Sequence, residues 1–128
     1  ERDPEAVAAC REEARRRGLT IRIEQADLET HRLPGAAYDL ITCFFYLDRA
    51  LIPQLREALK PGGAIVYETF SIEHRRRFGA PGRIEFCLQP NELTALFSGF
   101  AVMSAREGLV DGQYVSSLVA IKPGPVAR

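Results

Sequence analysis

One stretch, residues 38–70, constrains the fold of this chain more than any other part of its sequence. Residues 38–44 and 64–70 are short runs rich in β-forming apolar side chains, which suits strands that are buried on both faces. A helical pattern lies between them and is followed by the turn Pro61-Gly62-Gly63. The order strand, helix, glycine turn and strand predicts a βαβ crossover, which joins two parallel strands.

The helix of this crossover has recognisable ends. Asp48 is suited to open it, and Pro53 fits the first helical turn. Lys60 is placed where a cation complements the partial negative charge at the carboxyl end of a helix. One face is expected to pack on the sheet, because apolar side chains recur at helical spacing: Ile52, Leu55 and Leu59, widened by Leu51 and Ala58.

A parallel pair of strands also indicates where function is expected. Parallel sheets carry helices on both faces, and their ligands bind beyond the carboxyl ends of the strands. Those ends correspond here to residues 43–48 and 68–78. The sequence therefore predicts an α/β fold with a binding site built from these two segments.

Composition excludes several classes of partner. The chain has 128 residues, of which 46% are hydrophobic, and its 17 basic side chains equal its 17 acidic ones. We expect one domain over residues 1–122 and a tail at 123–128, with no charge imbalance that would support a nucleic-acid partner. No signal peptide is evident, and no apolar run reaches the roughly 20 residues that cross a bilayer, so no membrane partner is expected.

The cysteines point to a reducing compartment. Cys10, Cys43 and Cys87 are odd in number and show neither C-x-x-C spacing nor neighbouring histidines. This pattern suggests neither a disulfide framework nor a zinc site. We therefore expect no metal, and a cytoplasmic location fits best.

The residues before the crossover predict a helix and a further strand. Asp3 is a suitable N-cap, Pro4 fits the first helical position, and Gly18 closes the helix. Residues 19–26 alternate apolar and polar side chains, which predicts a strand that ends at Asp27. The helix carries a narrow apolar stripe of Val7, Cys10 and Ala14.

The residues after the crossover predict a binding loop and a closing hairpin. Residues 71–90 show little apolar periodicity and are too many for a simple connection, which is typical of a lid or binding loop. Residues 91–98 have a helical pattern. Residues 100–107 and 114–121 read as two antiparallel strands, joined around Asp111-Gly112 by a loop slightly longer than the minimal hairpin turn.

Several short motifs follow one another at the expected strand ends and turns: Asp3-Pro4-Glu5-Ala6-Val7, Ala26-Asp27-Leu28, Tyr38-Asp39-Leu40-Ile41 and Leu59-Lys60-Pro61-Gly62-Gly63. In this order they resemble class I S-adenosylmethionine-dependent methyltransferases, whose sheet also ends in a hairpin. Two further motifs are similar to a narrower, small-molecule branch that includes tellurite-resistance-type methyltransferases: Tyr46-Leu47-Asp48-Arg49 and Tyr67-Glu68-Thr69-Phe70. The resemblance implies methyl transfer from S-adenosylmethionine to a small-molecule acceptor.

The resemblance also implies which residues bind the cofactor. Glu1 matches the acid whose carboxylate accepts hydrogen bonds from the ribose hydroxyls. Asp27 matches the acid that contacts the adenine amino group, with Leu28 beside the ring. Cys43 and Phe44 match the segment that borders the methionine part of the cofactor. Without the resemblance, Asp27 is an exposed carboxylate at a strand end and Leu28 is a core residue.

Four residues are candidates for binding the acceptor: Phe45, Tyr46, Phe70 and Arg83. The aromatic side chains of the segment 43–46 would form an apolar wall against the sulfonium, whose positive charge is attracted to ring faces. Ordinary core packing is the alternative for the same rings. Arg83 and the arginines at 75–77 could recognise an anionic acceptor through their planar guanidinium groups, or they could be solvated loop charges.

Methyl transfer leaves little need for an acid–base pair. It is an in-line displacement at carbon, so the protein mainly holds donor and acceptor in line and excludes water. If a base is required, His74, Tyr46 and Glu68 are candidates by position. A nucleophilic role for Cys43 is disfavoured, because no histidine lies near it in the sequence to activate the thiol.

The sequence departs from the family pattern at its beginning. The glycine-rich turn after the first strand is missing, together with that strand and most of the second. The family sheet runs in the order three, two, one, four, five, seven, six, so this loss would leave unpaired strand edges. Three interpretations stay open: a truncated enzyme, an inactive fragment that pairs its edges with another chain or copy, and a nicotinamide-binding Rossmann domain in which Glu1 also meets a ribose.

Overall fold

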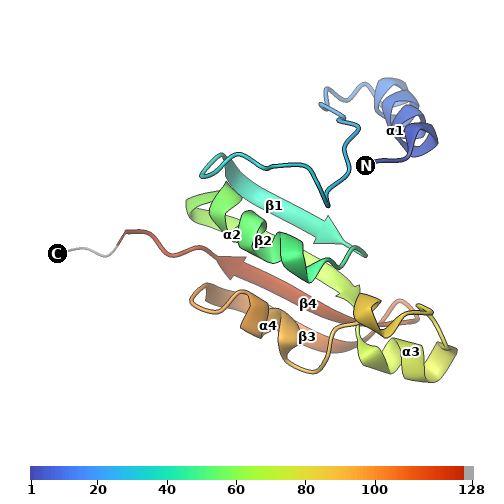
Figure 1. Ribbon diagram of the computed structural model, residues 1–128, viewed down its shortest axis with the longest axis vertical. Helices are drawn as coiled ribbons and strands as arrows, with labels where there is room; N and C mark the ends of the chain where they lie inside the picture. Colours follow the sequence, from blue (N-terminus) through green and yellow to red (C-terminus); the bar gives the residue numbers. More distant parts are fainter. Residues whose placement is uncertain (126–128) are drawn as a thin grey trace. The chain divides into compact units, whose positions relative to one another are not determined.

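The computed structural model describes residues 1–125, so residues 126–128 of the predicted tail lie outside the described part. The chain divides into two compact units, Glu1–Arg32 and Leu33–Arg128. The first unit contains helix α1 (Pro4–Arg16), and the second contains every strand that the structure assigns (Figure 1).

Helix α1 forms where the sequence predicts it. The carboxylate of its N-cap residue, Asp3, accepts a hydrogen bond from the amide N–H of Glu5 at 2.9 Å. Val7 and Ala14 are buried as predicted, but Cys10 is exposed. Since about 3.6 residues complete a helical turn, Ala14 lies nearly above Val7, whereas Cys10 is rotated roughly 60° away. The buried stripe is therefore narrower than the sequence pattern indicates.

Residues 19–26 form no strand, although one was predicted there. They make isolated hydrogen bonds with the start of the chain: the Ala26 amide donates to the Glu1 carbonyl at 2.8 Å, the Gln25 side chain donates to the Arg2 carbonyl at 3.3 Å, and the amino terminus donates to the Glu24 carbonyl at 3.5 Å. A strand requires a run of backbone hydrogen bonds to a neighbour. Alternating polarity alone does not supply such a neighbour, which is why the prediction was wrong.

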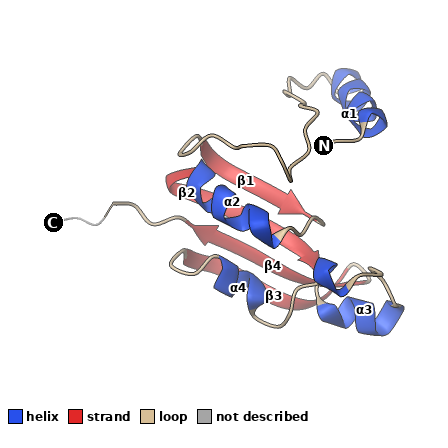
Figure 2. Ribbon diagram, in the orientation of Figure 1, coloured by secondary structure: helices blue, strands red, loops and turns tan. Residues whose placement is uncertain are grey.

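The second unit is built on a four-stranded sheet in the order β1-β2-β4-β3 (Figure 2). The strands are β1 (Tyr38–Phe44), β2 (Leu59–Phe70), β3 (Ala101–Val110) and β4 (Gln113–Ile121). β1 pairs with β2 in parallel, and β4 pairs antiparallel with both β2 and β3. The predicted α/β fold, its βαβ crossover and its antiparallel C-terminal hairpin are confirmed. The order β1-β2-β4-β3 corresponds to strands four, five, seven and six of the expected methyltransferase sheet.

Strand β2 begins at Leu59, earlier than the predicted residue 64, because the glycine turn runs alongside β1. Tyr38 pairs with Leu59, and the register shifts before the regular pairing resumes. A Cβ atom on Gly63 would lie 2.8 Å from the carbonyl oxygen of Lys60 and 3.1 Å from that of Asp39. This close approach of backbone to backbone therefore requires glycine at position 63.

Helices α2 (Ile52–Ala58) and α4 (Glu92–Leu96) pack on the same face of the sheet (Figure 1). A short 3-10 helix, Arg49–Leu51, leads into α2. Facing residues of β2 and β4 are buried on this side and form most of the core with the helices: Ile65, Tyr67, Leu118 and Ala120. The helical periodicity read from the sequence is confirmed here, since Ile52, Leu55 and Leu93 are all buried.

Strand β1 is not buried on both faces, contrary to the prediction. Leu40 is 55% exposed and Phe44 is 54% exposed. β1 is the outer strand of the sheet, so its outer side has no strand partner among residues 1–125. An apolar run is typical of a central strand, but the run by itself does not reveal whether neighbouring strands are present.

The closing hairpin is tighter than predicted. Asp111 and Gly112 have φ angles of 49° and 78°, the left-handed values required by a two-residue type I′ turn. Asp and Gly tolerate these values at low cost. The strands therefore continue up to the turn itself, and the hairpin has the minimal loop.

The segment at 71–90 contains a helix that the sequence did not reveal. Helix α3 (Ile72–Phe78) is followed by a short 3-10 helix, Ile84–Phe86. The Leu88 amide donates to the Phe70 carbonyl, and the Ile72 amide donates to the Leu88 carbonyl, both at 2.9 Å. The two ends of the segment are therefore held together at the carboxyl end of β2. Three consecutive arginines within α3 conceal its apolar periodicity.

A lysine that follows β4 completes the carboxyl end of α2. Nζ of Lys122 donates to the carbonyl oxygens of Arg56 and Leu59 at 2.7 Å each. The sequence assigned this role to Lys60, but Nζ of Lys60 instead lies 3.6 Å from Oδ1 of Asp39 at the surface. The last carbonyl groups of a helix lack partners within the helix, so a cation brought to them is stabilising.

We expect Lys122→Met to lower the free energy of unfolding by about 2 kcal/mol, because the two carbonyl groups lose a charged donor. Urea denaturation followed by circular dichroism measures this change. Lys60→Met is the matched control, and we expect it to cost less than about 0.5 kcal/mol because its ion pair is exposed. Equal losses in the two variants would contradict the role assigned to Lys122.

Candidate functional site

The turn that follows β1 is fixed by bonds to β2. Phe45 has a φ angle of 54°, which non-glycine residues rarely adopt, and its amide donates to the Glu68 carbonyl at 2.8 Å. The Tyr46 carbonyl accepts a hydrogen bond from the Tyr67 hydroxyl, and the Cys43 thiol lies 3.5 Å from the same oxygen. The strained turn is thus held in place at the carboxyl end of β1, where the sequence predicted a binding site.

The surroundings of Cys43 disfavour a nucleophilic role, in agreement with the sequence. Burial raises the pKa of the Cys43 thiol, and a hydrogen bond with Tyr67 opposes this rise only in part. Burial also raises the pKa of the Tyr67 hydroxyl. Both groups are therefore neutral near pH 7, and a protonated thiol is a poor nucleophile.

Five aromatic side chains form a continuous row at this end of the sheet, here called the ring row: Phe45, Phe70, His74, Phe78 and Tyr114. The centroids of successive rings lie 5.0, 4.5, 4.8 and 6.3 Å apart. The rings come from the turn after β1, the end of β2, helix α3 and the start of β4. The structure thus brings together two predicted acceptor residues, Phe45 and Phe70, and joins them to rings that the sequence did not group with them.

His74 is placed as a hydrogen-bond donor rather than as a base. Its Nδ1 accepts a hydrogen bond from the Tyr114 amide at 3.1 Å. A neutral imidazole has one acceptor nitrogen and one N–H, so this bond places the proton on Nε2. The lone pair that a general base would use is already engaged, which argues against the basic role considered for His74.

The other two candidate bases are Glu68 and Tyr46, and Glu68 is already engaged by a neighbouring hydroxyl group. Oε1 of Glu68 accepts a hydrogen bond from the Ser117 hydroxyl at 2.5 Å, and Glu68 lies opposite Phe44 in the β1–β2 register. Tyr46 is 37% exposed. This arrangement is better suited to positioning a reactant than to moving a proton.

Arg49 anchors the segment at 71–90. Its guanidinium binds both carboxylate oxygens of Glu92 at 2.5 and 2.9 Å and donates to the carbonyl groups of Glu85 and Cys87 at 2.7 and 3.0 Å. The hydrogen bond from Arg49 is the main reason that the pKa of Glu92 is lowered. Sequence reasoning missed this role because the partners lie 36 to 43 positions away along the chain.

The arginines considered for an anionic acceptor are largely engaged with other groups. Nε of Arg77 lies 2.7 Å from one Glu73 oxygen, and the Arg76 guanidinium lies 3.7 Å from the other. The Arg77 guanidinium also lies over the Tyr114 ring at 5.3 Å. An anion would therefore compete with Glu73 for these two cations. Arg83 is exposed and is the N-cap residue of the second 3-10 helix.

In the first unit, the backbone brings Glu1 beside the segment that carries Asp27, since the Ala26 amide donates to the Glu1 carbonyl at 2.8 Å. Oε1 of Glu1 accepts a hydrogen bond from the Asp3 amide at 3.0 Å, and this bond lowers the pKa of Glu1. Oδ1 of Asp27 accepts a hydrogen bond from the Glu29 amide at 3.0 Å. The Glu1 carboxylate is therefore ionised near pH 7 and suited to accept hydrogen bonds from hydroxyl groups.

The residues predicted to hold the cofactor fit its chemistry within each unit. In the first unit, Glu1 offers an ionised acceptor for hydroxyl groups, and Leu28 is a half-buried apolar side chain next to Asp27. In the second unit, the Phe44 ring is exposed at the end of β1, and ring faces attract a positive sulfonium. Cys43 beside it is neutral and half-buried.

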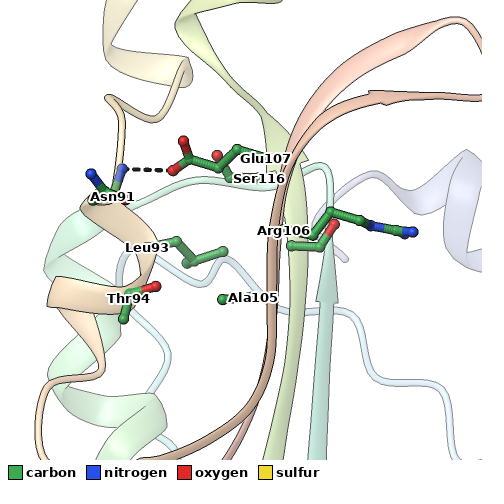
Figure 3. Close-up of a pocket in the computed structure, with 8 residues that line it drawn as sticks. Asn91, Leu93, Thr94, Ala105, Arg106, Glu107 and Ser116 are labelled. Atoms are coloured by element: carbon green, nitrogen blue, oxygen red, sulfur yellow. Dashed lines mark hydrogen bonds between the residues drawn. The ribbon is translucent and has the colours of Figure 1, made fainter.

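A separate cavity of about 210 Å³ lies between α4 and the strands β3 and β4 (Figure 3). Oε1 of Glu107 at its rim accepts a hydrogen bond from the Asn91 amide at 2.6 Å. The buried Ser116 hydroxyl has no hydrogen-bond partner among the described residues. None of the residues predicted for the site contributes to this cavity, which is lined by Asn91, Leu93, Thr94, Ala105, Arg106, Glu107, Ser116 and Ser117.

Residues 1–125 contain no group of three or more His, Cys, Asp or Glu side chains placed to hold a metal ion. Within the same residues, no helix combines the length and the apolar character that crossing a bilayer requires.

The first half of the chain is similar in sequence to a known protein family. Residues 1–63 match the family model described as a methyltransferase domain. No curated protein matches the chain significantly. The match covers the first unit and continues through β1 and α2 to the start of β2.

Solved structures share the fold over almost the whole chain. TehB from Haemophilus influenzae aligns with a TM-score of 0.75 and 16% identity over 95% of this chain and 48% of its own. The [4+2]-cyclase SpnF aligns with a TM-score of 0.73 and 18% identity over 96% of this chain and 64% of its own. An S-adenosylmethionine-dependent methyltransferase from Mesorhizobium loti aligns with a TM-score of 0.70 and 19% identity. The alignment covers 95% of this chain and 78% of the other protein. The chain thus spans about half the length of TehB.

The sheet order and these comparisons define a Rossmann-like methyltransferase fold. More particularly, the chain resembles class I S-adenosylmethionine-dependent methyltransferases, including TehB, as the sequence predicted. This resemblance implies S-adenosylmethionine as the cofactor. It supports the methyltransferase interpretation over the nicotinamide-binding one.

The Arg49–Glu92 pair predicts a specific dependence of stability on pH. Because the pKa of Glu92 is lowered from 4.5 on folding, its carboxylate stabilises the fold above that value and loses this contribution as pH falls through the folded pKa. We expect Glu92→Gln to be less stable than the original chain by about 1 kcal/mol at pH 7, with the difference shrinking as pH falls below 4.5 and through the lowered folded pKa of Glu92.

Urea denaturation at several pH values between about 7 and 3.5 measures this difference. Glu85→Gln is the control, because Glu85 is exposed on the same segment and forms no ion pair with another described residue. A difference between Glu92→Gln and the original chain that stays constant across this range would show that the ion pair does not cause it.

Proposed function

We propose that this chain transfers a methyl group from S-adenosylmethionine to a small-molecule acceptor. The observation that carries the proposal is the sheet order β1-β2-β4-β3, with a parallel start and an antiparallel hairpin at its end. The methyltransferase-domain match over residues 1–63 supports it independently, because β3 and β4 lie outside that match.

The fold by itself does not decide the reaction. A protein named as a [4+2]-cyclase shares this fold with a TM-score of 0.73. Function is determined by the residues of a site rather than by the architecture that carries them. The proposal therefore depends on which groups of this chain bind cofactor and acceptor.

The proposal gives cofactor-binding roles to residues of each unit, taken separately. Glu1 accepts hydrogen bonds from the ribose hydroxyls, Asp27 binds the adenine amino group, and Leu28 packs beside the adenine ring. Cys43 and Phe44 border the methionine part. The cofactor supplies an electrophilic methyl group on a positively charged sulfur, so a neutral Cys43 and an aromatic Phe44 are compatible neighbours.

The acceptor is held by the residues that end β1 and β2. Phe45, Tyr46 and Phe70 provide an apolar wall, and Arg83 is the polar candidate. The fixed turn at Phe45 and Tyr46 keeps this wall in one geometry, which favours an in-line displacement. Excluding water from the reacting groups is the remaining task of these side chains.

We expect S-adenosylhomocysteine, the demethylated product, to bind this chain with saturable one-to-one heat in isothermal titration calorimetry. Asp27→Asn should weaken this binding about tenfold, because an amide is a poorer acceptor than a carboxylate for the adenine amino group. The variant keeps an oxygen for the Glu29 amide, so the turn stays intact.

Asp39→Asn is the matched control, since Asp39 is exposed near the opposite end of β1. The heat of S-adenosylhomocysteine binding to this variant should equal that of the original chain. A folded sample that gives no heat with S-adenosylhomocysteine would contradict the proposed function of this chain. Equal weakening in Asp27→Asn and Asp39→Asn would contradict the place given to Asp27.

A second candidate function is assembly through the outer side of β1. β1 is an edge strand of the sheet, and the Leu40 side chain on it is 55% exposed. Unpaired strand edges with exposed apolar side chains are templates for pairing with another chain. In this interpretation the chain has no catalytic activity and pairs its open edge with a second copy or another protein.

The assembly interpretation predicts a dimer in light scattering, with twice the 14.3 kDa mass of the chain. Leu40→Lys should shift the sample to the monomer, because a lysine on a strand edge opposes pairing. Leu109→Lys, which places the same charge at an equally exposed position of β3, is the control. A monomer that binds S-adenosylhomocysteine would exclude this interpretation.

A further inference from the structure

The ring row presents aromatic surface to solvent at the end of the sheet where the acceptor is proposed to bind. Its first and fourth members, Phe45 and Phe78, are 45% and 59% exposed. Exposed apolar patches of this kind on a soluble chain mark ligand or partner sites.

Phe45, Phe70 and His74 are held in place by contacts within the chain. The left-handed turn at Phe45 is tied to β2 through the Glu68 carbonyl, and Phe70 is the last residue of β2, paired with Val115. The His74 ring stacks on Phe70 at 4.5 Å. A surface that is already ordered does not lose side-chain entropy on binding, which favours affinity for a rigid ligand.

The polar groups near the row favour an uncharged ligand over an anion. Arg76 and Arg77 are paired with Glu73, and Arg77 also covers the far end of the row at Tyr114. Nε2 of His74 carries the ring proton and has no hydrogen-bond partner among the described residues. The row therefore combines ring surfaces with an N–H donor on His74.

We infer that the acceptor is a planar aromatic molecule with an oxygen substituent, whose ring packs on the exposed faces of the ring row and whose oxygen accepts the His74 Nε2–H. The inference rests on the proposed function and narrows its substrate class. Aromatic pairs are favoured beyond the area that they bury, so a flat ring gains more here than a saturated molecule of the same size.

The transfer balances for a hydroxyl acceptor. The new carbon–oxygen bond uses an electron pair of the acceptor oxygen, and the pair of the broken carbon–sulfur bond stays on sulfur. The hydroxyl proton leaves to solvent. The His74 N–H stabilises the oxygen as it loses its proton, so His74 acts here as a positioning donor and not as a base.

Binding of 2-naphthol tests the inference directly. Its fluorescence can be followed without interference from tryptophan, because the chain contains none. We expect saturable binding to one site, and decahydro-2-naphthol should compete roughly tenfold more weakly, since it has the same hydroxyl and carbon skeleton but no aromatic face. Equal competition by the saturated compound would overturn the inference.

Two leucine substitutions locate the site. Phe78→Leu should weaken 2-naphthol binding about fivefold, because it removes a ring face but keeps an apolar side chain. Phe86→Leu is the matched control, since Phe86 is similarly exposed on the same segment and forms no ring contact with the described residues. Unchanged binding in Phe78→Leu, or an equal loss in both variants, would overturn the inference.

The same samples separate this inference from the proposed function. S-adenosylhomocysteine heat that persists while 2-naphthol fails to bind would overturn the aromatic acceptor and leave methyl transfer standing. Binding of 2-naphthol without any S-adenosylhomocysteine heat would overturn the assignment of the bound ring compound as a methyl acceptor.

Discussion

The hydrogen bonding of β2 on both of its sides is the constraint on which the second unit depends. β2 pairs in parallel with β1 and antiparallel with β4, so the ends of β1 and β2 and the start of β4 meet at one end of the sheet. The parallel pairing requires a crossover, which α2 supplies, and the close pairing at Gly63 requires a residue without a side chain. The proposed acceptor residues and the ring row both follow from this arrangement.

The side chains at that end of the sheet are better suited to positioning a reactant than to proton transfer. Cys43 and Tyr67 are neutral, Nδ1 of His74 is occupied by a backbone amide, and Glu68 is bonded to a serine hydroxyl. These groups hold the turn and the ring row in one geometry, while Arg49 fixes the neighbouring segment to α4 through Glu92. A displacement at carbon requires this kind of fixed geometry and little acid–base assistance.

Fold and sequence carry different information about this chain. Its solved relatives are less than one-fifth identical to it, yet they share its architecture closely. Architecture is maintained by apolar patterning and turn residues, which tolerate wide substitution, whereas the choice of acceptor depends on a few side chains. That is why the methyltransferase resemblance extends over the chain while the acceptor must be inferred from the ring row itself.

The sequence by itself determined the elements whose signals are local. The Asp3 cap of α1 and the Asp111-Gly112 hairpin depend on neighbours within a few residues, and the crossover from Tyr38 to Phe70 is marked by a continuous run of strand, helix and turn signals; each was predicted. Only the tertiary structure decided that β1 is exposed, that Lys122 rather than Lys60 caps α2, and that Phe45, His74 and Tyr114 share one row. These features join residues far apart in the chain, and a contact between distant residues leaves no periodic or local signal in the sequence.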